Sequence, residues 1–310
     1  MLLSVIIPYY NASLTLPEAL ESILGQGDVP SAEFIFINDG SNDGSNLIVE
    51  EFAGSHPYLN IKIISHHDNL GVGAAIATGL KAAEGKYVTR LDADDILLPD
   101  ALRLLTSEAE AVKADIVCSS YILDRRGKKS KTVHFPKGPV NLNRLPIDRV
   151  SFSLWAKLIK RSLLENNGVT TIPGINCWED LYVTARAFAL AGNVSIIQLP
   201  TYRYRVNPEV ESVSRQSKEI VLNDRIAYAE ALEKWFADKG IHDEFLPFLD
   251  RLKFMAKIKF LRSPRRDFGA WLNTFPEINR RILNMSHVPL WVRMASAALG
   301  LLPAKASQPR

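Results

Sequence analysis

The sequence has little of what secreted, fibrous or membrane-spanning proteins rely on. Its 310 residues include only 2 cysteines, Cys118 and Cys177, which excludes a disulfide framework and fits a reducing compartment. No segment reaches the roughly 18 apolar residues of a membrane-spanning helix, and Arg293 interrupts the longest apolar stretch, 288–302. Residues 1–8 lack a basic flank and a cleavage site, so we expect no signal peptide. There are no internal repeats.

What is present is enough apolar material for a sizeable core, together with an uneven charge. Hydrophobic residues make up 47% of the chain and charged residues 23%, which is typical of a globular protein. Residues 251–310 contain 12 Lys/Arg and 2 Asp/Glu, whereas residues 1–250 contain 25 and 32. A basic tail of this kind indicates an anionic partner, with a membrane surface as the first expectation and nucleic acid as the second.

The first 120 residues alternate between short apolar runs and helical spacing. Strands are expected at 3–7, 33–38, 61–65, 87–91 and 116–119, and helices at 16–24, 45–52, 72–83 and 99–112, the last with Pro99 in its first turn. This alternation predicts an α/β fold with a mostly parallel sheet flanked by helices. Further strands are expected at 194–199 and 201–206, and helices at 219–239 and 243–261. We therefore predict an α/β domain over 1–215 and a helical C-terminal region over 216–310.

Polar clusters follow four of the predicted strands. They are Tyr9-Tyr10-Asn11, Asn38-Asp39-Gly40-Ser41, residues 66–71 and Asp92-Ala93-Asp94-Asp95. In open α/β sheets, ligands bind beyond the carboxyl ends of the strands. Because those ends lie on one edge of a parallel sheet, we expect the four clusters to form a single site.

The acidic run is the strongest candidate for a metal site. Asp92, Asp94 and Asp95 directly follow a predicted buried strand, and three carboxylates this close repel one another unless a cation neutralises them. Carboxylate oxygens suit Mg²⁺ or Mn²⁺, which usually also bind substrate phosphates. The alternative is a solvated turn in which Asp95 caps the following helix.

Two other polar positions have competing interpretations. Asp39 is suited to accept hydrogen bonds from a nucleoside base or ribose, or else to cap the helix that follows it. The sequence His66-His67-Asp68 offers metal ligands but lacks the spaced partners of a zinc site. We therefore expect no zinc there.

Four blocks carry a family resemblance. They are SVIIPYYN at 4–11, NDGSNDGS at 38–45, NLG at 69–71 and LDADD at 91–95. In this order they resemble the opening blocks of family 2 glycosyltransferases, firmly over residues 1–120, weakly over 150–215 and not beyond about 220. The resemblance implies a GT-A fold in which 1–120 bind the nucleotide and 121–215 bind the acceptor.

The resemblance also implies a donor site. Residues that cradle the nucleotide sugar would be Pro8, Tyr9, Tyr10, Asn11, Asp39, Asn69, Gly71, Asp92 and Ala93. Asp94 would ligate Mn²⁺ or Mg²⁺, with Asp92 contacting the ribose or a metal-bound water, and Asp95 would be a support residue. Many members have Arg-Asn where this chain has Ile76-Ala77, so a donor contact on that helix is expected to be missing.

On the acceptor side, the family places the general base in an acidic pair. Here that pair is Glu179 and Asp180, with Asp180 the first choice; the alternative is that both are first-turn acids stabilised by the helix dipole. Weaker candidates for the acceptor or diphosphate are Trp155, Lys157, Trp178, Arg205 and Arg215. For Trp155 the alternative is an ordinary core position, and for the loop 207–215 a solvated surface.

Together these features predict an inverting, metal-dependent glycosyltransferase. The donor would be a nucleotide sugar, a UDP-sugar by resemblance, and the acceptor a glycan or lipid-linked saccharide in bacterial surface-polysaccharide synthesis, at the cytoplasmic face of the membrane. Two other functions stay open: a nucleotidyltransferase, which more often has a Gly-rich basic loop where this chain has residues 8–11, and a non-catalytic scaffold. The basic tail is expected to contact the membrane, the catalytic domain or a second copy in a homodimer, and no nucleic acid.

Overall fold

The computed structural model describes residues 1–27, 31–206, 218–262, 267–285, 288 and 290–300. The chain forms two compact units, Met1–Val213 and Ser214–Arg310, and each is considered by itself. The predicted boundary at 215/216 falls within 207–217, outside the described residues. It therefore stays a prediction, as does the division of the first unit into a nucleotide-binding half and an acceptor-binding half.

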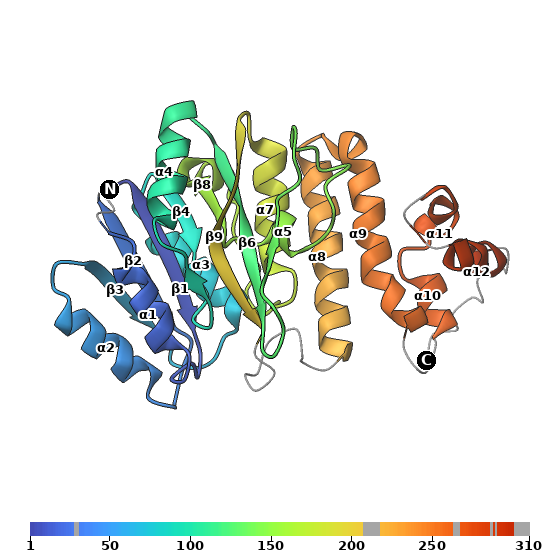
Figure 1. Cartoon of the computed structure of the whole chain (residues 1–310). Helices are drawn as coiled ribbons and strands as arrows, with labels where there is room; N and C mark the ends of the chain where they lie inside the picture. Colours follow the sequence, from blue (N-terminus) through green and yellow to red (C-terminus); the bar gives the residue numbers. More distant parts are fainter. Residues whose placement is uncertain (28–30, 207–217, 263–266, 286–287, 289, 301–310) are drawn as a thin grey trace. The chain divides into compact units, whose positions relative to one another are not determined.

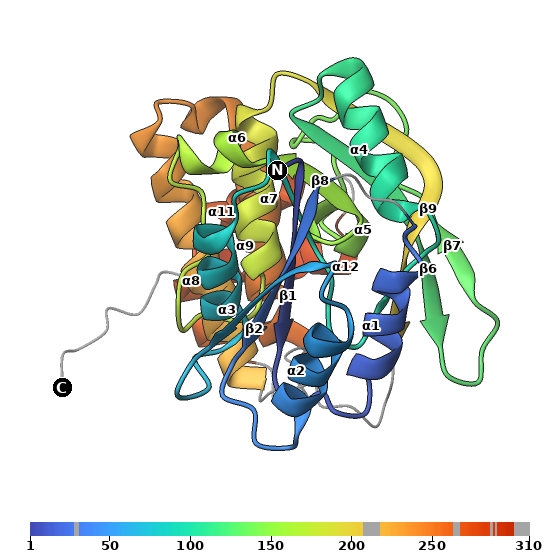
Figure 2. The ribbon, with the colours of Figure 1, turned by 90° about the vertical axis from the view of Figure 1, so that its left-hand side faces the viewer.

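The first unit is a single sheet with helices packed against it (Figure 1). Its strands are β1 (Leu3–Tyr9), β2 (Ala32–Asn38), β3 (Asn60–Ser65), β4 (Tyr87–Arg90), β5 (Ile96–Leu97), β6 (Ile116–Arg125), β7 (Lys131–Val133), β8 (Lys157–Lys160) and β9 (Val194–Val206). Its helices are α1 (Leu16–Leu24), α2 (Ser45–Ser55), α3 (Val72–Ala82), α4 (Ala101–Val112), α5 (Arg149–Phe152), α6 (Arg161–Glu165) and α7 (Glu179–Leu190). Helices α1 and α2 lie on one face of β1 and β2, and α3 lies on the other (Figure 1, Figure 2).

The sheet confirms the α/β prediction but is mixed in direction. Its strand order is β3-β2-β1-β4-β8-β6-β9-β5, with β7 paired to β6. The strands β3, β2, β1 and β4 are parallel, as are β6 and β9, whereas β8, β7 and β5 pair antiparallel with their neighbours. The prediction of a mostly parallel sheet is confirmed, because β6 is antiparallel to β8 as β4 is and therefore runs with the first four strands, and only β8, β7 and β5 run against them. Short buried strands have the same apolar composition in either direction, so their sequence does not encode it.

The predicted elements of the first unit match the observed ones closely, with two differences. Helix α4 begins at Ala101, after Asp100 in the left-handed conformation (φ 60°), so Pro99 precedes the helix instead of lying in its first turn. The two strands predicted at 194–199 and 201–206 are one strand, β9, with an irregularity in its pairing opposite Ser119 and Ser120.

The carboxyl ends of the first strands meet at one edge, as predicted. Three main-chain hydrogen bonds continue the ladders past the strand ends: Asp39 N to Tyr9 O (2.9 Å), His66 N to Asn38 O (2.8 Å) and Leu91 N to Ile6 O (3.0 Å). Gly40 has φ 73°, and a Cβ there would lie 2.7 Å from the carbonyl carbon of Asp68. The loops after β2 and β3 are therefore packed backbone to backbone, which brings their polar residues together.

The second unit is helical. It contains α8 (Lys218–Asp238), α9 (His242–Arg262), α10 (Phe268–Asn273), α11 (Ile278–Arg281), a 3₁₀ turn (Ile282–Asn284) and α12 (Leu290–Gly300). No helix in the described part of the chain is long and apolar enough to cross a membrane.

Helix α9 buries apolar residues of the basic tail. Phe254, Ile258 and Leu261 of this helix are all buried. A neighbouring cation is buried too: Lys253 Nζ lies 2.5 Å from Glu233 Oε1 and 2.6 Å from Glu277 Oε1. These residues of α9 therefore belong to the core of the second unit instead of a membrane-facing surface.

Candidate active site

The acidic run after β4 has the donor chemistry of a cation site. One carboxylate oxygen from each of Asp92, Asp94 and Asp95 lies within 4.8 Å of the others. Burial, together with repulsion from Asp94 and Asp180 and against the attraction of Arg90, raises the pKa of Asp92 to about 6. Carboxylates this close together are hard to ionise at the same time, and a bound cation would stabilise their charged forms.

Asp95 differs from Asp92 and Asp94 in its surroundings. It is fully buried, and both its oxygens accept hydrogen bonds from β9, from Tyr202 Oη (2.8 Å) and from the main-chain N–H of Arg205 (2.7 Å). It is neither a solvated turn residue nor a helix cap, since the N-cap of α4 is Asp100. Asp95 therefore ties the acidic run to β9 through both of its carboxylate oxygens, and its support role stays a prediction.

Strand β9 is tied to the acidic run by two further contacts. Tyr202 Oη accepts a hydrogen bond from the N–H of Asp92 (3.0 Å), and Arg205 Nε donates to the main-chain carbonyl of Asp94 (2.6 Å). Arg205 also pairs with Glu18. The structure thus brings Arg205, one of the weaker sequence candidates, to the acidic run.

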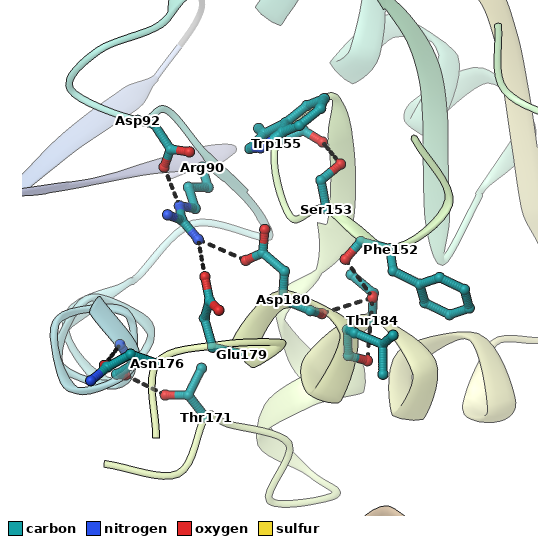
Figure 3. Close-up of polar contacts among 12 residues, drawn as sticks. Arg90, Asp92, Phe152, Ser153, Trp155, Thr171, Asn176, Glu179, Asp180 and Thr184 are labelled. Carbon is teal, nitrogen blue, oxygen red and sulfur yellow. Dashed lines mark hydrogen bonds and ion pairs between the residues drawn. The ribbon is translucent and has the colours of Figure 1, made fainter. Parts of the chain in front are cut away.

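Arg90, the last residue of β4, connects the acidic run to the second acidic pair (Figure 3). Its side chain is 9% exposed and contacts three carboxylates: Nε binds Asp92, and Nη1 lies 2.7 Å from Asp180 Oδ1 and 3.3 Å from Glu179 Oε1. The sequence motifs did not point to Arg90. The signal that could have found it is a cation at the end of an otherwise apolar strand, directly before an acidic run.

Glu179 and Asp180 form the first turn of α7, and Trp178, with φ 81°, precedes it. Their side chains are 14% and 18% exposed. Burial, followed by repulsion from Asp180, raises the pKa of Glu179 to about 8 despite the attraction of Arg90. Thr184 Oγ1 donates to the carbonyls of Asp180 (2.8 Å) and Phe152 (2.9 Å), which fixes this turn of the helix (Figure 3).

Residues 8–11, which are predicted to bind the nucleoside, include both buried and exposed side chains. Pro8 and Tyr9 lie within buried β1, and Tyr9 Oη donates to Asn46 Oδ1 (2.9 Å). Tyr10 is 46% exposed. Asn11, with φ 45°, accepts a hydrogen bond from the N–H of Asn42 (2.9 Å). Tyr10 therefore offers the accessible aromatic surface of this loop.

Asp39 holds the loop that follows β3. Its Oδ1 accepts from Leu70 N (3.0 Å) and its Oδ2 from Gly71 N (2.8 Å), while His66 Nδ1 lies 2.7 Å from Oδ1. It is not a helix cap, because α2 begins at Ser45 after Gly44.

The 69–71 loop is packed against the segment before α7. Asn69 Oδ1 accepts from the N–H of Gly71 (3.1 Å). Gly71 has φ 89°, and a Cβ there would lie 2.2 Å from Asn176 Oδ1, which itself accepts from Gly73 N at 3.2 Å. Only glycine fits at position 71, so the loop and the acceptor-side segment are closely joined.

Two of the weaker candidates are buried, and a third lies outside the described residues. Trp155 is 3% exposed and stacks on Tyr202 and Tyr204, with ring centroids 4.8 and 5.3 Å away, which is the core position given as its alternative. Lys157 is fully buried and donates to the carbonyl of Val150 (2.8 Å), so it does not face a phosphate. Burial lowers its pKa to about 8. Arg215 lies outside the described residues.

The chain is similar in sequence to known proteins. The family "Glycosyl transferase family 2" matches residues 4–168. The chain is 32% identical to "Uncharacterized glycosyltransferase EpsJ" of Bacillus subtilis over 67% of its length and 62% of that protein. It is 31% identical to "Cholesterol galactosyltransferase" of Borreliella burgdorferi, over 78% of the chain and 69% of that protein. The alignment thus spans less than two thirds of EpsJ.

The fold is shared with solved glycosyltransferases. The structure of S. aureus TarS 1-349 in complex with UDP-GlcNAc superposes with a TM-score of 0.74 at 22% identity, over 97% of this chain and 88% of that one. The mannosyltransferase PcManGT from Pyrobaculum calidifontis gives a TM-score of 0.55 at 19% identity, over 96% and 79%. The family match covers more than half of the chain, and the chain belongs to glycosyl transferase family 2.

Proposed function

We propose that this chain transfers a sugar from a nucleotide-sugar donor, a UDP-sugar, to a hydroxyl of a glycan or lipid-linked acceptor, with inversion at the anomeric carbon. The observation that carries the proposal is the ion-pair cluster around Arg90, which places Asp92 of the acidic run and Asp180 of the second pair on one guanidinium. A donor-binding site and a general base must lie this close, because both act on the same anomeric carbon.

The acidic run fits Mn²⁺ or Mg²⁺. Both oxygens of Asp95 are used by β9, and Asp92 Oδ1 is used by Arg90. We propose the carboxylate of Asp94 and the second oxygen of Asp92 as the ligands, because the three aspartates of the run each bring one carboxylate oxygen within 4.8 Å of the others. Two carboxylates with the remaining positions left to phosphate and water suit Mg²⁺ or Mn²⁺. When bound, the ion would neutralise charge on the departing diphosphate.

Asp180 is the base in this proposal. A carboxylate within hydrogen-bond reach of the acceptor hydroxyl takes its proton as the oxygen attacks the anomeric carbon. Arg90 holds the Asp180 carboxylate through a hydrogen bond of 2.7 Å, and Thr184 fixes the helical turn that carries it. Glu179, whose pKa is raised to about 8, is the second choice. A single displacement from the face opposite the leaving group inverts the centre.

The nucleoside would lie over Tyr10 and reach Asp39. Tyr10 offers an exposed ring for stacking. Asp39 Oδ1 already accepts two hydrogen bonds, whereas Oδ2 accepts one, from Gly71 N. The remaining lone pair on Oδ2 suits a base with an imino N–H, as in uridine. Ile76, where many relatives have arginine, is 1% exposed and adds no donor contact.

The acceptor would belong to bacterial surface-polymer synthesis. This part of the proposal is supported by relatives named "Succinoglycan biosynthesis protein ExoO", 25% identical, and "Poly(ribitol-phosphate) beta-glucosyltransferase", 28% identical. The reaction would then take place at the inner face of the plasma membrane.

Helix α12 would provide a peripheral membrane contact. Leu290, Trp291 and Met294 are between 55% and 65% exposed, while Val292 is fully buried. The exposed three lie within a turn of one another, and aromatic and aliphatic side chains next to cations such as Arg293 suit an anionic bilayer surface. A second copy of the chain is the alternative partner for this face.

One screen tests the central proposal. Purified protein is incubated with a panel of nucleotide sugars and Mn²⁺ or Mg²⁺, and nucleotide release is measured for the wild type, Asp94→Ala and Asp68→Ala. We expect the wild type to release nucleotide from a UDP-sugar. The control Asp68→Ala, which removes an exposed carboxylate in the neighbouring loop, should do the same. Activity that persists in Asp94→Ala or in excess chelator would contradict the metal assignment, and a retained anomeric configuration would contradict inversion.

A further inference from the structure

His66 occupies a partly buried position between three elements. It follows β3 directly, and its side chain is 10% exposed. Nδ1 lies 2.7 Å from Asp39 Oδ1 at the end of β2, and Nε2 lies 2.9 Å from Thr78 Oγ1 on α3. The neighbouring His67 is 96% exposed, and its Nδ1 lies 3.0 Å from the carboxylate of Asp68, which is 80% exposed. The two adjacent histidines therefore have opposite environments.

The partners of His66 determine which nitrogen carries the proton in the neutral ring. An ionised carboxylate only accepts hydrogen bonds, so the proton lies on Nδ1 and is donated to Asp39. Nε2 then accepts from the hydroxyl of Thr78, and a hydroxyl can rotate to donate. Asp39 thus selects the ring tautomer, and the hydrogen bond with Thr78 helps to orient the ring.

This contact decides how the Asp39 carboxylate is presented. Without His66, the carboxylate would keep one main-chain donor on each oxygen, Leu70 N on Oδ1 and Gly71 N on Oδ2, and each oxygen would have a lone pair open to a ligand. With His66 in place, Oδ1 is saturated, and the open lone pair is confined to Oδ2. The imidazole therefore determines which oxygen of Asp39 is available to a ligand.

We propose that His66 is a positioning residue of the donor site, which orients Asp39 toward the imino N–H of the nucleoside base. This inference rests on the proposed function, because it requires Asp39 to contact the nucleoside. It assigns a role to a histidine whose sequence context gave it none beyond a rejected zinc site. The binding of both ring nitrogens to Asp39 and Thr78 also explains why His66 is not available as a metal ligand.

A purely structural role would produce a different pattern of effects. If His66 only stabilised the loop, its loss would lower thermal stability and weaken all nucleotides alike. A positioning role predicts loss of base discrimination, because uracil presents an imino N–H where cytosine presents an acceptor nitrogen. The ratio of UDP to CDP affinity separates the two.

The experiment measures UDP and CDP binding by calorimetry, and melting temperature, for the wild type and four variants. His66→Asn keeps an amide N–H near the place of Nδ1 and should stay close to the wild type. His66→Gln reaches toward Thr78 instead and should lose roughly tenfold in UDP affinity, as expected for a lost hydrogen bond to a charged group, with CDP little changed. His67→Ala is the matched control and should bind both as the wild type does. Asp39→Asn tests the contact on which the inference rests.

The outcomes are distinct. If Asp39→Asn leaves the UDP to CDP ratio unchanged, the nucleoside assignment in the proposed function fails, and the inference fails with it. If Asp39→Asn lowers the ratio but His66→Gln does not, only the role of His66 is overturned. The role of His66 would also be overturned if His66→Gln lost UDP and CDP affinity equally and melted at a lower temperature, and if His66→Asn did not restore the affinity.

Discussion

Arg90 donates a hydrogen bond of 2.7 Å to Asp180 across 90 positions of sequence. The same guanidinium binds Asp92 and Glu179. One buried cation therefore joins the carboxylates proposed for the donor side to those proposed for the acceptor side. Its planar, forked donors can serve several carboxylates at once, which a lysine ammonium on a flexible stem does less well.

Removing Arg90 should destabilise the first unit. Arg90→Ala leaves three partly buried carboxylates without their common partner, and breaking a buried ion pair costs about 3–5 kcal/mol of unfolding free energy. Arg90→Lys should recover part of this loss but not activity. Denaturant unfolding gives the measurement. Arg103→Ala, which removes an exposed pair with Asp100, is the control and should leave stability nearly unchanged, as is usual for surface ion pairs. Equal effects of the two alanine variants would contradict the assignment of Arg90.

Asp180→Asn should lower kcat by roughly 10²–10⁴-fold, the usual contribution of a general base. The KM for the donor should change little, because the amide has nearly the same shape and the donor contacts lie on the other side of Arg90. Steady-state transfer rates, with Glu179→Gln in parallel, give the comparison. A larger fall in kcat for Glu179→Gln than for Asp180→Asn would assign the base to Glu179 instead.

Stability should depend on pH through Glu179. Its pKa is about 8 in the folded protein against an ordinary value of 4.5, so the folded state binds the proton more tightly than the unfolded state between these values. The unfolding free energy of the wild type should therefore fall as pH rises through this window. Glutamine at position 179 does not titrate. The unfolding free energy of Glu179→Gln should therefore exceed that of the wild type by an amount that grows from near zero at about pH 5 to roughly 1–3 kcal/mol at about pH 9. Melting curves across this range provide the measurement, and a constant difference would refute the raised pKa.

The exposed face of α12 should matter for vesicle binding. We expect the wild type to sediment with vesicles that contain anionic lipid, and the triple variant Leu290→Ser, Trp291→Ser, Met294→Ser to sediment several-fold less, since each apolar side chain withdrawn from water contributes about 1.5–3 kcal/mol. The matched control replaces three exposed apolar residues of the first unit, Leu14, Leu47 and Tyr58, with serine. If both variants bind alike, the membrane contact is not on α12; if the α12 variant instead loses dimerisation, the face is a homodimer contact.

Local sequence determined the first half of the fold and the location of the site. Short windows of sequence reveal the strand and helix periods, the buried strands β1 and β2, and the turn residues that follow them. Because neighbouring strands such as β1 and β2 are parallel, their carboxyl ends share one edge of the sheet. The four polar blocks, the acidic run among them, could therefore be assigned to one edge of the sheet from the amino-acid sequence alone.

Tertiary structure decided what each of those residues contacts. Asp95 is paired with Tyr202, 107 positions away, and Lys157 is buried although its charge suggests a surface. Sequence likewise did not reveal the contacts of Arg90 and His66 or the mixed strand directions. These depend on which distant segments meet when the domain folds. A periodic pattern specifies which face of an element is buried, but the partners of a buried charge are chosen by the packing of the whole domain.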